Sequence, residues 1–226
     1  MSGNRQSITV DEMSTQRQLV RELYRHHAPW YDSVAAPALG SSFQLEAVSY
    51  LRLKPGDVVV DVACGTGSTF TLIKQKIGET GHLIGIDLSP EMLQQARACV
   101  VANGLTNVSL INAPAEEAQF NETADAFLFS FAHDVLQSSR TLHNLFQRAT
   151  PGARVAACGI KLAPWWNIPL NYFIYQIAWK YHTEHKGLLE PWGCLERFVS
   201  DLKVKVKAFG TIYVAFGTVA INGRAA

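Results

Sequence analysis

A run of β-branched residues leads directly into a turn that contains two glycines. The run is DVVVDVA, residues 57–63, and CGTGSTFTLIKQKIG follows at residues 64–78. The continuous apolar run predicts a buried strand, and the segment after the turn predicts a helix that ends at Gly78. A strand that passes through a glycine turn into a helix is typical of an open α/β sheet, which binds ligands at the carboxyl ends of its strands.

The same alternation of strand and helix continues to residue 160. Apolar runs predict further strands at residues 82–88, 107–113, 125–131 and 153–160, and helical patterns lie at 89–104 and 141–150. Residues 202–209 and 211–221 then predict two strands joined by a tight turn at Gly210. We therefore expect an α/β fold, with a doubly wound, mostly parallel seven-stranded sheet and a C-terminal antiparallel hairpin.

Length and composition indicate one domain. A chain of 226 residues with 48% hydrophobic content can build one large core but not comfortably two. We expect residues 1–15 to be a flexible N-terminus and 16–226 to form a single domain. Within that domain, residues 16–53 are expected to form a helical cap and residues 161–190 an aromatic lid or substrate insert.

Charge, cysteine content and hydropathy indicate which partners and which cellular compartment to expect. With 20 basic and 19 acidic residues, the chain offers no general field for a polyanion, so we expect no nucleic-acid partner. Four scattered cysteines without a paired motif favour a reduced, cytoplasmic protein. The apolar segment 162–179 is interrupted by Pro164, Pro169 and polar residues, so we expect no stable membrane insertion. His182, Glu184 and His185 have no further ligand pair nearby in the sequence, so we expect no metal.

Acidic residues on either side of the glycine turn distinguish between classes of nucleotide ligand. A dinucleotide fingerprint would place glycine at positions 65, 67 and 70, but the third position is Phe70, and the turn lacks the lysine of a phosphate-binding P-loop. Asp61 precedes the glycines, where a carboxylate repels a pyrophosphate and suits an ammonium group. Asp87 follows Gly67 by twenty residues and is placed to accept hydrogen bonds from ribose hydroxyls.

Because of these residues and the motifs around them, the chain resembles the class I S-adenosylmethionine-dependent methyltransferases over roughly residues 45–220. The family's motifs appear as VVDVACGTG, IGIDLSPEML, NVSLINAPAEE, ADAFLFSF and PGARVAACG. The chain is most similar to the ubiquinone-type and small-molecule members, in which YD precedes the core, as Tyr31 and Asp32 do here. The resemblance implies a Rossmann-like fold, S-adenosylmethionine as the cofactor and a small-molecule methyl acceptor.

The resemblance also implies a set of cofactor-binding residues. Asp61, Gly65 and Gly67 would lie along the methionine part of the cofactor, Asp87 would hold the ribose, and Tyr24 or Tyr31 would close over the methionine carboxylate. Leu88 and Met92 would cover the adenine, although Met92 and either tyrosine could equally be packing residues. The full set comprises Tyr24, Tyr31, Asp61, Ala63, Gly65, Thr66, Gly67, Asp87, Leu88, Met92, Asn112, Ala115 and Glu116.

Two positions depart from the family pattern. Ala63 replaces the common first glycine, a change that we expect to be tolerated if the backbone there has a negative φ. Pro114 stands where many members place an aspartate that accepts a hydrogen bond from the adenine amino group. Asn112 or Glu116 would have to take that role.

Residues after the fourth predicted strand are candidates for proton transfer. His133 is the first candidate for a general base, with Asp134 beside it, because a histidine titrates near neutral pH. The alternative is that Asp134 caps the next helix and His133 bonds a loop carbonyl.

An aromatic segment is the candidate cover for the acceptor. Trp165, Trp166, Tyr172 and Tyr175 are expected to bind an aromatic or otherwise hydrophobic substrate, because aromatic residues are dense in this segment. Aromatic walls would also attract the sulfonium of the cofactor. A structural role in the core is the alternative. The sequence thus predicts methyl transfer by in-line displacement to O, N or C of a small metabolite. The alternatives are a cofactor-binding scaffold without catalysis and a nicotinamide oxidoreductase, and the oligomeric state is left open.

Overall fold

The computed structural model describes residues 41–172, 174 and 187–220. The predictions for Tyr24, Tyr31 and Tyr175 lie outside the described residues, as do those for residues 1–15 and for the histidines at 182 and 185. Of the predicted N-terminal helical cap, the described part contains one helix, α2 (Ser41–Tyr50).

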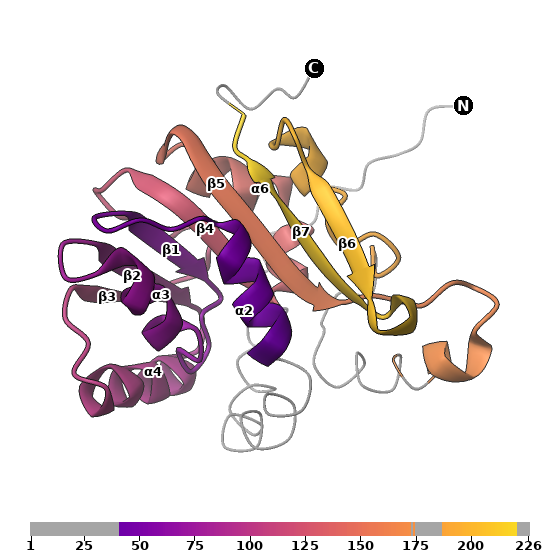
Figure 1. The fold of residues 1–226 in the computed structure, drawn as a ribbon, viewed down its shortest axis with the longest axis horizontal. Coiled ribbons are helices and arrows are strands. Elements are labelled where there is room, and N and C mark those ends of the chain that lie inside the picture. Colours follow the sequence, from indigo (N-terminus) through magenta and orange to yellow (C-terminus); the bar gives the residue numbers. More distant parts are fainter. Residues whose placement is uncertain (1–40, 173, 175–186, 221–226) are drawn as a thin grey trace, which may run out of the picture.

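Seven strands form one sheet in the order β3-β2-β1-β4-β5-β7-β6 (Figure 1). Neighbours are parallel from β3 through β5, whereas β7 runs antiparallel to both β5 and β6. This arrangement confirms the predicted doubly wound sheet with its closing hairpin. The strands are β1 (Val58–Val62), β2 (His82–Asp87), β3 (Val108–Asn112), β4 (Ala124–Ser130), β5 (Ala149–Ile160), β6 (Lys203–Lys207) and β7 (Ile212–Thr218).

Helices cover both faces of the sheet, and the sheet separates two hydrophobic core clusters. On one face, α2, α3 (Phe70–Ile77) and α4 (Pro90–Ala102) pack on alternate strand residues such as Val59 and Leu128. On the other face, α5 (His133–Leu136) and α6 (Ser139–Phe146) pack on the intervening residues, such as Val60 and Phe127. None of the helices in the described part of the chain is long and apolar enough to cross a membrane.

The fifth strand and the helix before it differ from their predicted positions. The strand begins at Ala149 rather than after the Pro151-Gly152 turn, because Ala149 already pairs with Ala124 of β4. The register then shifts between Ala124 and Ala126, as Gly152 adopts a φ of 82°. Helix α6 ends at Phe146, since the chain from Ala149 onward belongs to the sheet.

The C-terminal hairpin carries the lysines of the predicted strand at residues 202–209 on an exposed face. A short 3₁₀ turn, η3 (Ala208–Gly210), joins β6 to β7, and Lys203, Lys205 and Lys207 are exposed as expected. Lys205 donates a 2.6 Å hydrogen bond to the Tyr50 hydroxyl. This hydrogen bond links α2 to the edge strand of the sheet.

Candidate cofactor site

The acidic and polar residues singled out in the sequence meet at the carboxyl edge of the parallel strands. Asp61 is the penultimate residue of β1, and Asp87 is the last residue of β2. Asp87 pairs in register with Asn112 at the end of β3, and Ser130 ends β4. An open α/β sheet binds ligands outside this edge, so the predicted residues lie where the fold places a site.

The glycine turn uses three residues with a left-handed backbone. Gly65 has a φ of 56° and Gly67 a φ of 80°. Ala63 has a φ of 55°, so the negative φ under which we expected alanine to be tolerated is not present. A side chain in the left-handed region costs about 1–2 kcal/mol. Glycine avoids this cost, which explains why it is common at this position, whereas alanine does not avoid it.

Phe70 explains why glycine occurs at two positions around it. Its side chain is fully buried at the start of α3. A Cβ on Gly67 would lie 2.7 Å from the Phe70 ring, and a Cβ on Gly85 of β2 would lie 2.8 Å from it. The large residue that argued against a dinucleotide site therefore occupies space that two glycines leave open, close beneath the turn.

Asp87 joins the glycine turn to the segment after β2. Its Oδ2 accepts a 2.8 Å hydrogen bond from the Gly65 N–H, and its Oδ1 accepts one of 2.9 Å from the Ser89 N–H. Burial raises the pKa of Asp87 above its usual value, and the backbone N–H donors oppose that rise. Backbone N–H groups therefore orient both carboxylate oxygens.

Asp61 is buried below the turn. Only 1% of the residue is exposed, and its Oδ2 accepts a hydrogen bond from the Thr69 hydroxyl. Its Oδ1 is buried and has no hydrogen-bond partner in the part of the chain that the structure describes. Burial raises the pKa of Asp61 to about 7, the Thr69 hydrogen bond lowers it, and the nearby Asp87 carboxylate raises it further.

The two carboxylates fit a cationic nucleoside. Among the described residues, neither forms an ion pair with a lysine or arginine. A ligand with an ammonium or sulfonium group and ribose hydroxyls would supply both the missing positive charge and donors for Asp87. A Cβ added to Gly65 would meet no atom of the described residues within 4 Å. These observations suit S-adenosylmethionine.

The other predicted cofactor residues differ in how well they are placed for contact. The Asn112 amide donates 3.0 Å hydrogen bonds to the carbonyls of Asp87 and Leu88, so it supports the turn after β2. Met92 is 3% exposed, Ala115 lies in the main core cluster, and Thr66 is buried at the turn. Leu88 and Glu116 are half-buried.

His133 and Asp134 begin the one-turn helix α5, directly beyond the end of β4. His133 is buried, and Asp134 is half-buried. The alternative role for Asp134 as a cap of the following helix is wrong, because the Ser138 hydroxyl accepts the capping hydrogen bond from the Thr141 N–H. The pair lies on the strand-end side of the sheet, as expected.

Gln44 is a site residue that the sequence did not reveal. Its side-chain amide donates hydrogen bonds of 3.2 Å to the Ser68 hydroxyl and 2.9 Å to the Ser130 hydroxyl. It thereby joins α2 to the glycine turn and to the end of β4. A lone glutamine in a helical segment carries no sequence signal for such a role.

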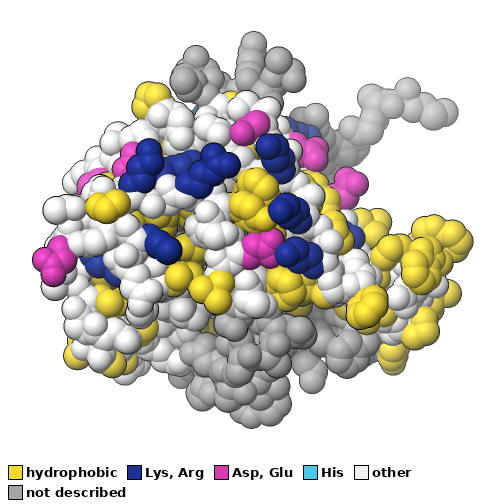
Figure 2. All heavy atoms as spheres, in the orientation of Figure 1, with side chains coloured by type: hydrophobic (Ala, Val, Ile, Leu, Met, Phe, Trp, Pro, Cys, Tyr) yellow, Lys and Arg dark blue, Asp and Glu magenta, His cyan; other side chains and the backbone are white. Residues whose placement is uncertain are grey.

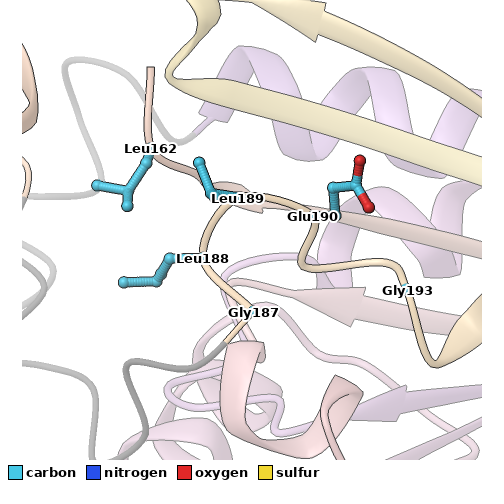
Figure 3. Close-up of a pocket in the computed structure, with 6 residues that line it drawn as sticks. All are labelled: Leu162, Gly187, Leu188, Leu189, Glu190 and Gly193. Carbon is cyan, nitrogen blue, oxygen red and sulfur yellow. The ribbon is translucent and has the colours of Figure 1, made fainter. Parts of the chain in front are cut away.

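The predicted substrate residues that the structure describes are strongly exposed to solvent. Trp165, Trp166 and Tyr172 are between 66% and 83% exposed. A separate open groove of about 500 Å³ lies beside the chain after β5, between Leu162, Gly187, Leu188, Leu189, Glu190 and Gly193 (Figure 3). None of the predicted site residues that the structure describes lines this groove, and no group of three potential metal ligands lies together in the same part of the chain.

Comparison with known proteins identifies the family. The family model for a methyltransferase domain matches residues 53–168. A demethylmenaquinone methyltransferase from Listeria monocytogenes is 29% identical over 169 residues, which are 71% of this chain and 71% of that protein. A chloroplastic 2-phytyl-1,4-beta-naphthoquinone methyltransferase from Arabidopsis thaliana is 29% identical over 160 residues, 66% of this chain and 59% of that protein.

Solved structures agree on the fold. A S-adenosylmethionine-dependent methyltransferase from Aquifex aeolicus superposes with a TM-score of 0.55 at 20% identity, covering 80% of this chain and 93% of its own. The cyclase SpnF superposes with a TM-score of 0.63 at 14% identity, covering 92% of this chain and 97% of its own. The second example shows that this fold alone does not fix the reaction. The matching family model, the relatives and the paired carboxylates at the strand ends together establish that the chain belongs to the class I S-adenosylmethionine-dependent methyltransferases and uses that cofactor.

Proposed function

We propose that this enzyme methylates a small hydrophobic acceptor with a quinone-type ring, in its reduced, hydroxyl-bearing form. The observation that carries the proposal is the match over 71% of the chain to a protein named for methylation of a menaquinone precursor. The Arabidopsis relative, named for a naphthoquinone, supports the same class of acceptor. A reduced ring suits the chemistry, because its hydroxyl groups make the ring oxygens and carbons nucleophilic.

In this proposal, residues at the strand ends hold the cofactor, which supplies a methyl group on a positively charged sulfur. Asp87 accepts hydrogen bonds from the ribose hydroxyls, and Asp61 provides negative charge below the methionine part. The glycine turn, held by Asp87 and Gln44, brings its backbone close to the ligand. Such preorganisation lowers the barrier mainly by fixing the direction of approach to the methyl group.

In this proposal, His133 removes the proton from the acceptor. Methyl transfer to an acceptor O–H or ring C–H would break the bond between the methyl carbon and the cofactor sulfur and form one from that carbon to the acceptor atom. The sulfur leaves as neutral S-adenosylhomocysteine, and one proton has to leave the acceptor. His133 lies directly beyond β4 and takes that proton as general base, with Asp134 next to it. The buried setting of His133 excludes bulk water from the transfer.

The acceptor class can be tested directly. The full chain is incubated with methyl-labelled S-adenosylmethionine and either reduced 1,4-naphthoquinone or an indole or phenol without the quinol pattern. We expect label in the naphthoquinol product, detected by mass spectrometry. Methylation of the phenol or indole alone would contradict the quinone-type acceptor, whereas a rise in melting temperature with S-adenosylhomocysteine tests cofactor binding separately.

A further inference from the structure

Exposed hydrophobic side chains concentrate at one end of the molecule. Among the described residues, nine large hydrophobic side chains are strongly exposed, and seven of these belong to three neighbouring segments. We call these seven the apolar tip. They are Trp165, Trp166, Ile168, Tyr172, Leu189, Val206 and Phe209.

The segments of the apolar tip are joined at their bases. A Cβ on Gly210 would lie 2.8 Å from Cδ of Pro164, so the residue after Phe209 packs against the residue before Trp165. The Lys161 N–H donates a 2.8 Å hydrogen bond to the Thr211 carbonyl, and the Leu162 N–H donates one of 2.8 Å to the Leu188 carbonyl. The three segments that carry the tip are therefore joined to one another beyond the ends of β5 and β6.

The size and composition of the apolar tip are typical of an interaction surface. Trp165 is 83% exposed and Phe209 is 92% exposed. Aromatic side chains present on the order of 150–250 Å² each, so the tip exposes several hundred Å², the range in which apolar patches mark interaction sites. No charged residue occurs from Leu162 through Tyr172.

A positively charged face lies next to the tip. Lys203, Lys205 and Lys207 project from the edge strand β6, and Glu46, paired with Lys207 at 2.6 Å, offsets one of the three charges. Figure 2 shows these basic side chains beside the hydrophobic ones that gather at the right-hand end of the molecule. Lysines on an edge strand also prevent strand pairing, but that role does not explain the exposed tryptophans.

We propose that the apolar tip docks on the surface of a lipid bilayer with anionic headgroups, with the lysines of β6 facing the headgroup phosphates. Tryptophan and tyrosine are the side chains that prefer the boundary between hydrocarbon and water. An apolar patch with a basic border matches the pattern of proteins that lie on, rather than span, a membrane. The inference does not depend on the proposed acceptor.

The test is co-sedimentation of the full chain with vesicles of neutral phosphatidylcholine and with vesicles that also contain phosphatidylglycerol. We expect binding to the anionic vesicles that weakens with added salt. The double variant Trp165→Ala with Trp166→Ala should bind at least about tenfold more weakly. Lys203→Gln should lose about fivefold, and only with anionic vesicles.

Matched variants separate docking from folding. Phe209→Asn removes an exposed ring at a position with a φ of 55°, which asparagine tolerates, so it should reduce binding while the lipid-free melting temperature holds. Val101→Ala and Lys76→Gln alter exposed residues of α4 and α3 and should bind as the unaltered chain does. Absence of binding to either vesicle, or undiminished binding by the tryptophan double variant, would overturn the proposal. So would a dimer in analytical ultracentrifugation that the double variant converts to monomer without any vesicle binding.

Discussion

The backbone N–H of Gly65 donates a 2.8 Å hydrogen bond to the carboxylate of Asp87, which lies 22 positions further along the chain. The turn after β1 is therefore tied to the end of β2. Because the second oxygen of the same carboxylate accepts from Ser89, the side chain cannot rotate without breaking a hydrogen bond. A ribose would meet a carboxylate whose direction is already set.

Asp87→Ala should weaken binding of S-adenosylhomocysteine by about tenfold to hundredfold. Hydrogen bonds to a charged group contribute about 1.5–3 kcal/mol, and the variant loses the ribose acceptor together with the anchor of the turn. Isothermal titration calorimetry measures the change. Glu196→Ala, at an exposed acid of η2 (Leu195–Arg197), is the control and should bind normally. Equal affinity in both variants would contradict the assignment of Asp87.

Ala63→Gly should stabilise the protein by about 0.5–1 kcal/mol. Glycine relieves the cost of a left-handed φ at this position, and that gain exceeds the entropy that glycine loses on folding. Urea denaturation measures the free energy of unfolding. Ala98→Gly, at an exposed position within α4, should instead destabilise by about 0.5–1 kcal/mol. A loss of stability in both variants would show that the conformation of Ala63 costs little.

Asp61 should make the apo protein less stable as pH rises. Its pKa is about 7 in the folded chain against an ordinary 3.8, so the folded state holds the proton more tightly than the unfolded state. The contribution of this group to the free energy of unfolding therefore falls by about 4 kcal/mol between about pH 4 and pH 7, and it levels off at higher pH.

Asp61→Asn tests this dependence because it keeps an acceptor for Thr69 and removes the charge. Denaturation at pH 5 and pH 8 should show a gain in stability for the variant that is much larger at pH 8. Asp87 titrates in both proteins, so the difference between them isolates Asp61. A constant difference across the range would mean that Asp61 is ionised throughout.

His133→Ala should lower turnover by about 10²–10⁴-fold while affinity for S-adenosylhomocysteine changes by no more than a few-fold. The variant removes the proposed base and leaves the glycine turn intact. Single-turnover rates and calorimetry separate the two quantities. His143→Ala, at an exposed histidine of α6, provides the matched control. Undiminished turnover would remove His133 from the mechanism.

Much of the fold could be predicted because periodicity and turn chemistry agreed along the chain. The β-branched run before the glycines, Ser89 as a helix cap with Pro90 after it, and Gly78 at the end of α3 each have a local physical cause. The start of β5 could not be predicted in this way. It depends on the pairing of Ala149 with Ala124, which lie 25 residues apart in the sequence. The free energy of that pairing is not determined by the residues next to Ala149.

The site was predictable where a residue type is required by the ligand and unpredictable where it depends on tertiary packing. The carboxylates of Asp61 and Asp87 followed from their positions at strand ends. The conformation of Ala63 did not, since alanine suggests a negative φ and the surrounding turn imposes the opposite. The exposure of Trp165 likewise depends on which surfaces lie nearby, and an aromatic side chain suits a pocket wall and a surface patch equally.

The two hydrogen bonds of Gln44 tie the helix before the sheet to two separate segments. Ser68 belongs to the glycine turn and Ser130 lies three residues before the proposed base His133, so one amide links the turn to the end of β4. A truncation or fusion that unravels α2 would thus loosen both segments together. An expression tag placed near this helix could depress activity even though every residue of the turn and of the proposed base is intact.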